Sequence, residues 1–165
     1  VLRTVLAGYE AMLCEVRGER YRPGAVQVVI SGDRPHRDIA AREQRRVGID
    51  GRLSDLSSTA PAHLIPLISD RWTSHFGWRG EGEFPDAERR KLQEIVRRAH
   101  AAGRRVRFWA TPEKPALWQE LIAAGVDHIN TDQLDELQDF LLKHHNGGRT
   151  DGASGRPYTE GRTTD

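Results

Sequence analysis

Every second residue is apolar over residues 105–111, in a run bounded by Gly103 and Pro112. A period of two over so short a run is typical of a strand rather than a helix. Ahead of this run, residues 85–102 carry apolar side chains at helical spacing, and Gly103 suits the position after the last helical turn. The pattern therefore predicts a helix that leads directly into a strand.

The pattern beyond this strand predicts a helix, a second strand and a closing helix. Pro115 suits the first turn of a helix, where its missing N–H is not needed, and Gly125 suits the stop. Residues 126–130 form a further apolar run, after which Thr131 or Asp132 caps a last amphipathic helix. Two apolar strands joined by one helix form a right-handed βαβ crossover, the unit of parallel α/β folds.

The first third of the chain has a less regular pattern. Residues 1–17 carry apolar side chains at a 3.6-residue period, which predicts an amphipathic helix that ends near Gly18. Residues 25–31 are almost entirely apolar, as in a strand of a parallel sheet that is buried on both faces. A short charged helix over residues 35–45 and a brief strand over residues 47–50 complete this part.

The middle of the chain contains two predicted loops. Residues 53–62 are rich in Ser, Thr and Pro and are expected to be a loop. Residues 63–69 are expected to be extended, although Pro66 favours an edge or irregular strand. Residues 70–84 form the longest irregular stretch and are rich in aromatic residues and glycine. Loops of this length in compact domains tend to be lids or binding loops.

The alternation of strands and helices predicts an α/β fold with four or five parallel strands and flanking helices. With 165 residues the chain is long enough to bury one core. We expect a single domain over residues 1–145. The segment 146–165 is polar and without an apolar period, so we expect it to be a disordered tail.

Composition narrows the classes of partner. The formal net charge is +1, with both signs mixed along the chain, so no nucleic-acid partner is indicated. The single cysteine, Cys14, excludes an internal disulfide and a cysteine-based zinc site. No apolar run is long enough for a transmembrane segment. The chain begins with Val rather than Met, so both an exported and a cytoplasmic location stay open.

Polar and aromatic side chains follow the predicted strands at their carboxyl ends, where parallel α/β folds hold their reacting groups. The candidate substrate-binding residues are Ser31, Asp50, Arg52, Trp72, Arg79 and Trp109. The same rule selects, with less specificity, Asp33, Arg34, Ser69, Asp70, Thr111, Asn130 and Asp132.

Several of these candidates also have a plain structural interpretation. Asp33 and Asp50 suit loop or turn positions, which is the simpler interpretation, and Arg52 suits a local ion pair with Asp55 that contributes little. Arg79 has the chemistry to bind a phosphate bidentately, but a solvated loop arginine is the simpler reading. Trp109 either faces a substrate or packs in the core, because successive strand residues point to opposite faces.

Five motifs carry a resemblance to a known family. They are Trp-Ala-Thr at 109–111, GVDHINTD at 125–132, VVISGDRP at 28–35, IDGRLSDL at 49–56 and LIPLISDRW at 64–72. The first two resemble the closing segment of the glycerophosphodiester phosphodiesterases and the phosphatidylinositol-specific phospholipase C-like barrels. The other three are similar to the bacterial branch related to altered inheritance of mitochondria protein 6. The resemblance covers roughly residues 1–142.

The resemblance implies that this chain is the C-terminal part of a TIM-type (β/α)8 barrel. Complete barrels of this type have about 250 residues. The family hydrolyses phosphodiesters with a histidine acid and a histidine base, in many members with a divalent metal, Ca or Mg, held by Glu and Asp. No position of this chain matches those groups, so we expect neither catalytic residues nor metal ligands in it. The resemblance places Trp109 at the barrel mouth, against the glycerol or inositol part of a phosphodiester or phospholipid-derived small molecule.

Two other functions stay open at this point. One is a non-catalytic α/β module that binds a partner through the aromatic loop 72–84. The other is an unrelated flavodoxin-like binding domain, which would need a glycine-rich phosphate loop after its first strand. The GDRP sequence at 32–35 is a poor match to such a loop.

Overall fold

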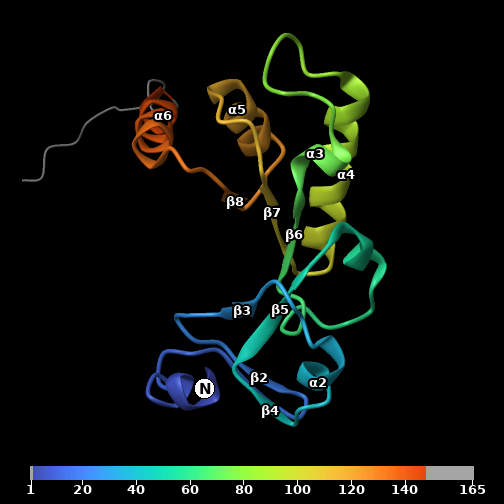
Figure 1. The fold of residues 1–165 in the computed structure, drawn as a ribbon, viewed down its shortest axis with the longest axis vertical. Helices are drawn as coiled ribbons and strands as arrows, with labels where there is room; N and C mark the ends of the chain where they lie inside the picture. The colour runs from blue at the N-terminus through green and yellow to red at the C-terminus, as the bar shows by residue number, and fades with distance from the viewer. Residues whose placement is uncertain (1, 148–165) are drawn as a thin grey trace, which may run out of the picture. The chain divides into compact units, whose positions relative to one another are not determined.

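The computed structural model describes residues 2–147 (Figure 1). The chain divides into two compact units, Val1–Thr131 and Asp132–Asp165, and each is described by itself. The first unit contains both sheets of the structure.

A five-stranded parallel sheet forms the centre of the first unit. Its strands are β3 (Val28–Ile30), β5 (Val47–Gly51), β6 (Leu67–Arg71), β7 (Arg105–Trp109) and β8 (His128–Ile129). The spatial order is β3-β5-β6-β7-β8, so each strand lies beside the strand that precedes or follows it in this sheet. All four pairs are parallel. The predicted α/β fold is confirmed.

The sheet has one apolar and one polar face. Ile49, Ile68, Val106 and Phe108 are all 0% exposed and lie in one core cluster with residues of the flanking helices. Because successive side chains point to opposite faces, the intervening residues Asp50, Ser69, Arg107 and Trp109 lie on the other face. The core is therefore built on one side of the sheet only.

Two predicted helices supply that core. They are α4 (Asp86–Ala101), which buries Leu92, Ile95, Val96 and Ala99, and α5 (Pro115–Ala123), which buries Leu117, Trp118 and Leu121. Pro115 opens α5 as expected. Gly103 and Gly125 follow the two helices with φ of 67° and 79°, the left-handed conformation that favours glycine at a helix stop. Both helix predictions are confirmed.

A small antiparallel sheet precedes the parallel one. It consists of β1 (Glu15–Arg17), β2 (Arg20–Arg22) and β4 (Gln44–Arg45), in the order β2-β1-β4. Glu15 is buried at its centre and forms ion pairs with Arg17, Arg22 and Arg46. The hydrogen bond from Gln44, with Arg17 and Arg46, lowers the pKa of Glu15 to about 2 although burial opposes this. One ionised carboxylate thus ties the small sheet together.

The predictions for the first third of the chain are partly wrong. The helix expected over 1–17 is limited to α1 (Leu2–Ala7), which has no buried residue. Leu13 instead bridges Val26, and the following residues pair as a hairpin. The strand at 25–31 is only half-buried at Val28–Ile30. Strand pairing has overridden a local helical pattern, because an isolated helix of this length is marginal.

Two neighbouring predictions also need correction. The helix expected over 35–45 ends early, as α2 (His36–Ala40), because Gln44 and Arg45 pair with β1. The predicted edge strand at 63–69 is central, since β6 lies between β5 and β7. Pro66 precedes β6, so its missing N–H interrupts no ladder, and its carbonyl accepts the N–H of Arg105.

The predicted loops contain short helices. The segment 53–62 holds the 3-10 helix η1 (Leu53–Ser57). In the irregular stretch 70–84, β6 continues to Arg71 and α3 (Trp72–His75) follows. The strand predicted at 47–50 is confirmed as β5, and the run 126–130 contains β8.

The second unit begins with the closing helix predicted from the sequence. It is α6 (Leu134–Gly147), with Asp135 and Glu136 in its first turn. The predicted domain boundary at residue 145 stays a prediction. The predicted tail, 146–165, lies from residue 148 on outside the described residues.

Arg104 fixes the loop after η1 to the start of β7. Its side chain is 2% exposed and donates hydrogen bonds to the carbonyl oxygens of Asp55 (2.5 Å), Ser58 (2.8 Å) and Ala60 (2.7 Å). We expect Arg104→Met to lower the free energy of unfolding by about 3 kcal/mol, because three main-chain carbonyls lose a buried charged donor. Urea denaturation of the purified variant measures this.

Arg90→Met is the matched control, because Arg90 is an exposed arginine of α4. It should change the free energy of unfolding by less than about 0.5 kcal/mol. Equal stability of the Arg104 and Arg90 variants would contradict the role of Arg104.

Candidate functional site

The carboxyl ends of the parallel strands meet at one edge of the sheet, and Asp50 is the centre of the contacts there. Asp50 is 4% exposed. Its Oδ2 accepts a hydrogen bond from Ser31 Oγ at 2.7 Å and one from Arg52 Nη1 at 2.9 Å. Arg34 Nη1 donates to the main-chain carbonyl of Asp50 at 2.6 Å. The structure thus brings together three of the six predicted site residues, Ser31, Asp50 and Arg52.

Arg52 is held in one orientation by this cluster. Besides Asp50, its Nη1 donates to the carbonyl of Ser69 on the neighbouring strand β6 at 2.9 Å. The side chain of Arg52 is still 26% exposed. A guanidinium carries five N–H donors, so the exposed part of Arg52 presents donors that suit a bidentate anion. The buried Oδ1 of Asp50 has no hydrogen-bond partner among the described residues and adds one acceptor.

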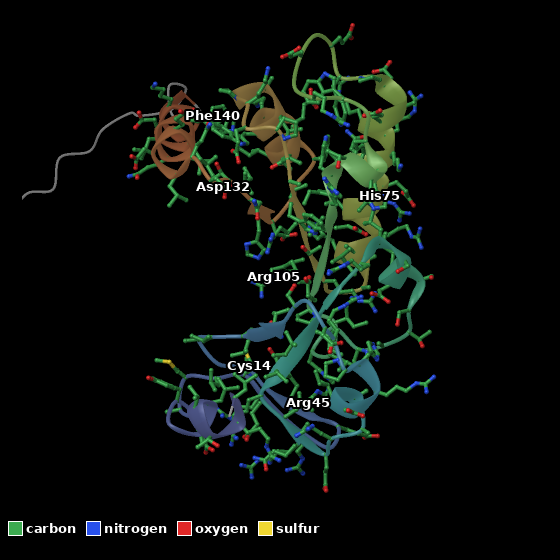
Figure 2. The ribbon with its side chains drawn as sticks, in the orientation of Figure 1. Cys14, Arg45, His75, Arg105, Asp132 and Phe140 are labelled. Atoms are coloured by element: carbon green, nitrogen blue, oxygen red, sulfur yellow. The ribbon has the colours of Figure 1, made fainter. Side chains whose placement is uncertain are left out.

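Further arginines lie on the same face of the sheet. Strand register places Arg105 beside Leu67, Arg107 beside Ser69 and Arg71 beside Trp109. Arg105 points away from the face that carries α4, which lies on the side of His75 (Figure 2). On this face β6, β7 and β8 carry no Asp or Glu. The face is therefore positively charged.

Trp109 belongs to this polar face, and Phe108 belongs to the core. The Trp109 ring is half-buried, and the Arg71 guanidinium carbon lies 5.8 Å from its centroid. The next residue, Ala110, has φ of 51°, a left-handed conformation that costs a non-glycine residue about 1–2 kcal/mol. Such strain is typical of functional sites. Trp109 therefore lies on the polar face of the sheet, and its role in substrate binding stays a prediction.

Trp72 and Arg79 do not belong to the hydrogen-bonded cluster around Asp50. Trp72 is completely buried, its ring 4.1 Å from that of Phe76, and it offers no surface to a substrate in this structure. The Arg79 Nη1 donates to the carbonyl of Phe76 at 2.8 Å and so folds back onto its own loop. Neither residue forms a hydrogen bond with Asp50, and their substrate-binding roles stay predictions.

The aromatic loop 72–84 contributes to the core rather than to the surface. Trp72, Phe76, Trp78 and Phe84 are all buried and pack on one another. The Glu88 carboxylate of α4 accepts the N–H groups of Gly77 and Trp78 and holds the loop against the helix. No observation therefore favours a partner-binding role for these aromatic side chains.

Sequence reasoning missed a histidine–carboxylate pair. His75 Nε2 lies 3.2 Å from Asp70 Oδ2. Burial alone would raise the pKa of Asp70, but the N–H groups of Leu53 and Arg71, together with His75, lower it. The pair lies on the side of α4, since Lys91 Nζ donates to the His75 carbonyl at 2.7 Å. The partners are five positions apart across a strand–helix junction, so neither a strand nor a helix period signals the pair.

The described residues do not fit a divalent metal. Among residues 2–147 no group of three or more His, Cys, Asp or Glu side chains is placed to hold a metal ion. The acid at the centre of the site, Asp50, is already engaged by Arg52 and Ser31. No chemical step of this site is therefore assigned to a metal.

Among residues 2–147, no helix has the length and apolar character needed to cross a bilayer.

Comparisons with known proteins agree with the sequence motifs. Residues 105–135 match the Glycerophosphoryl diester phosphodiesterase family. The chain is also 28% identical over 144 residues to "Altered inheritance of mitochondria protein 6" of Eremothecium gossypii, an alignment that covers 76% of this chain and 37% of that protein. The chain thus spans little more than a third of the length of this relative. No solved structure matches the chain. The resemblance inferred from the sequence is confirmed.

Asp50 should be the residue on which the geometry of this site depends. We expect Asp50→Asn to lower the free energy of unfolding by about 2 kcal/mol, because Arg52 loses a buried charged acceptor. Asp33→Asn is the matched control, since Asp33 is exposed in the loop that follows Ser31, and it should be nearly neutral. Denaturation of both variants in urea measures the difference. Identical midpoints would mean that Asp50 does not organise the site.

Proposed function

We propose that this chain is the C-terminal part of a TIM-type (β/α)8 barrel in a phosphoric diester hydrolase that acts on glycerophosphodiesters or phosphoinositide-like lipids. The observation that carries the proposal is a parallel sheet in sequential strand order whose face opposite the core cluster is rich in arginine. In a barrel the strands follow one another around the axis, and the helices cover only the outside. The five strands β3, β5, β6, β7 and β8 have the order of such an arc.

The strand order does not favour a flavodoxin-like domain. Doubly wound sheets reverse direction at a switch point, which gives orders such as 2-1-3-4-5, and they carry helices on both faces. The order β3-β5-β6-β7-β8 has no such reversal. The core cluster also includes only one face of the sheet. The face with Asp50 and Arg107 would then be the interior of the barrel.

The chemistry of this face suits a phosphodiester. Arg52, Arg71 and Arg107 place positive charge at or near the carboxyl ends of three adjacent strands. Guanidinium groups bind phosphate oxygens bidentately and stabilise the charge that develops when the phosphodiester is attacked. Trp109 supplies an apolar surface beside them for the glycerol or inositol part of the substrate.

This chain would supply the substrate-side wall of the active site. The histidine acid and base, and a Ca or Mg ion with its ligands, would belong to other parts of the intact protein. The match to only 37% of the relative's length is consistent with such a division. The family match covers residues 105–135, which contain β7 with Trp109 and also β8. It therefore supports the proposal for this part of the chain.

Trp109→Ala in the intact protein tests the proposal. If the ring packs against the substrate, kcat/KM for a glycerophosphodiester or phosphatidylinositol should fall about 10- to 200-fold, the effect of about 1–3 kcal/mol of lost apolar contact. The effect should appear mainly in KM. The melting temperature should change little, because the half-buried ring leaves no closed cavity.

Phe108→Leu is the matched control, because Phe108 is its neighbour on the core face of β7. That variant should lower the melting temperature and leave kcat/KM of the folded protein close to wild type. An intact protein without turnover on either substrate class would contradict the proposed function. A Trp109 variant with unchanged kcat/KM and a large loss of stability would contradict the role of the ring.

A further inference from the structure

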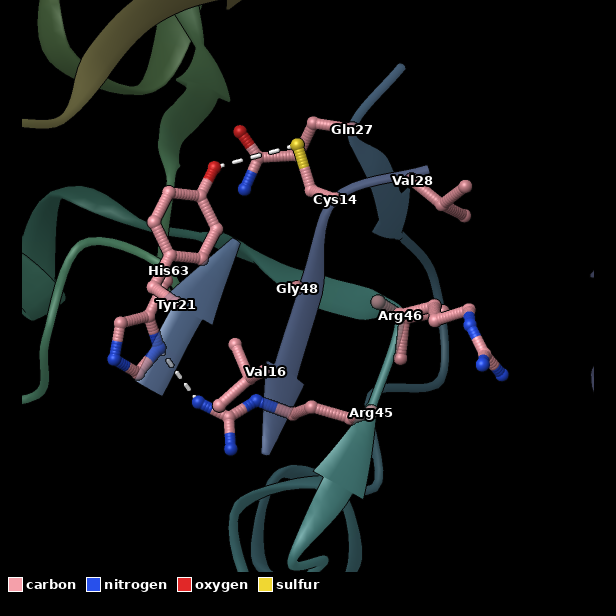
Figure 3. Close-up of a pocket in the computed structure, with 10 residues that line it drawn as sticks. Cys14, Val16, Tyr21, Gln27, Val28, Arg45, Arg46, Gly48 and His63 are labelled. Carbon is pink, nitrogen blue, oxygen red and sulfur yellow. Dashed lines mark hydrogen bonds between the residues drawn. The ribbon is translucent and has the colours of Figure 1, made fainter. Parts of the chain in front are cut away.

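A small cavity lies between the antiparallel sheet and the amino-terminal ends of the parallel strands (Figure 3). Its volume is about 10 Å³, which suits one water-sized particle. The polar residues that line it include Cys14, Tyr21, Gln27, Arg45 and His63. The strand-end site is at the opposite ends of these strands, so the cavity is separate from it.

Arg45 reaches this cavity from β4. Only 8% of the residue is exposed. One guanidinium nitrogen, Nη2, lies 2.6 Å from Nδ1 of His63, and Nε is buried without a hydrogen-bond partner among the described residues. No carboxylate of the described chain forms an ion pair with Arg45. Burial also lowers its pKa, as expected for a cation without a nearby negative charge.

The other polar groups of the cavity do not supply that negative charge. Arg45 donates to Nδ1 of His63, so this imidazole is neutral, and burial together with Arg45 lowers its pKa. The His63 ring stacks on Tyr21, with 5.7 Å between centroids. The Cys14 sulfur accepts the O–H of Tyr21 and the N–H of Gly24, each at 3.3 Å. These groups are neutral donors and acceptors.

Two other arginines of this unit, the partly buried Arg46 and the buried Arg104, show how such charges are usually accommodated. Arg46 pairs with Glu10 and Glu15, and Arg104 donates to three carbonyl oxygens. Taking a cation out of water costs several kcal/mol unless a charge or several hydrogen bonds compensate. Among the described residues, the Arg45 side chain has one hydrogen-bond partner, the neutral imidazole of His63. Apolar walls, among them Val16 and Val28, strengthen any electrostatic interaction inside the cavity.

We propose that this cavity binds one small monatomic anion of the size of chloride, held by the guanidinium of Arg45. The anion would neutralise Arg45 and accept a hydrogen bond from its Nε. A space of about 10 Å³ favours a monatomic anion over phosphate or sulfate. This anion would stabilise the base of the sheet and is independent of the proposed phosphodiester site.

Thermal unfolding of the full chain in different sodium salts tests this site. At matched ionic strength, chloride should raise the melting temperature saturably by about 2–4 °C relative to gluconate, because it binds only the folded state. The linewidth of the chloride NMR signal should increase with the protein present and recover on unfolding. In Arg45→Met both effects should disappear.

Arg42→Met is the matched control, because Arg42 is an exposed arginine three residues earlier, and it should keep both chloride effects. A wild-type protein with equal melting temperatures in chloride and gluconate, and no chloride line broadening, would overturn the proposal in favour of a bound water. An equal chloride response in wild type and Arg45→Met would overturn it in favour of a general salt effect. If Arg45→Met does not fold, the NMR measurement on the wild type decides alone.

Discussion

The structure depends on one constraint, the period of two that places successive strand residues on opposite faces of the parallel sheet. Once Ile49, Ile68, Val106 and Phe108 are buried against the helices, the residues between them must lie on the other face. Those residues are Asp50, Ser69, Arg107 and Trp109. A one-residue slip of β7 would move Arg107 into the core, so packing and the position of the polar groups are fixed together.

The polar face is held in order by charges that have defined partners. Asp50 joins Ser31, Arg34 and Arg52 across β3, β5 and their loops. Arg104 holds the loop after η1 in place by donating hydrogen bonds to three main-chain carbonyl oxygens. Breaking such buried interactions is costly, because one partner is left without compensation. On this face, β6 and β7 carry arginines and no Asp or Glu. This face therefore suits an anionic substrate.

Sequence periodicity predicted the C-terminal half of the first unit well. β7, α5 and β8 have strong apolar patterns and glycine or proline boundaries, so local signals and tertiary packing agree there. The strand-end rule also selected Ser31, Asp50 and Arg52, which the structure brings together because carboxyl ends of parallel strands meet at one edge. Periodicity could not predict the hairpin at 15–22, since its pairing depends on Glu15 and on Gln44, far away in the sequence. The same limit applies to Arg45 and His63, which meet only in three dimensions.

The central claim is that the face with Asp50, Arg107 and Trp109 is the ligand-binding side of the sheet. Hydrogen–deuterium exchange of the intact protein, with and without glycerol phosphate or inositol phosphate, tests it most directly. Ligand should slow exchange at the carboxyl ends of β5, β6 and β7, including the Ala110 region. Protection confined to the loop 76–84, or no protection at saturating ligand, would contradict it.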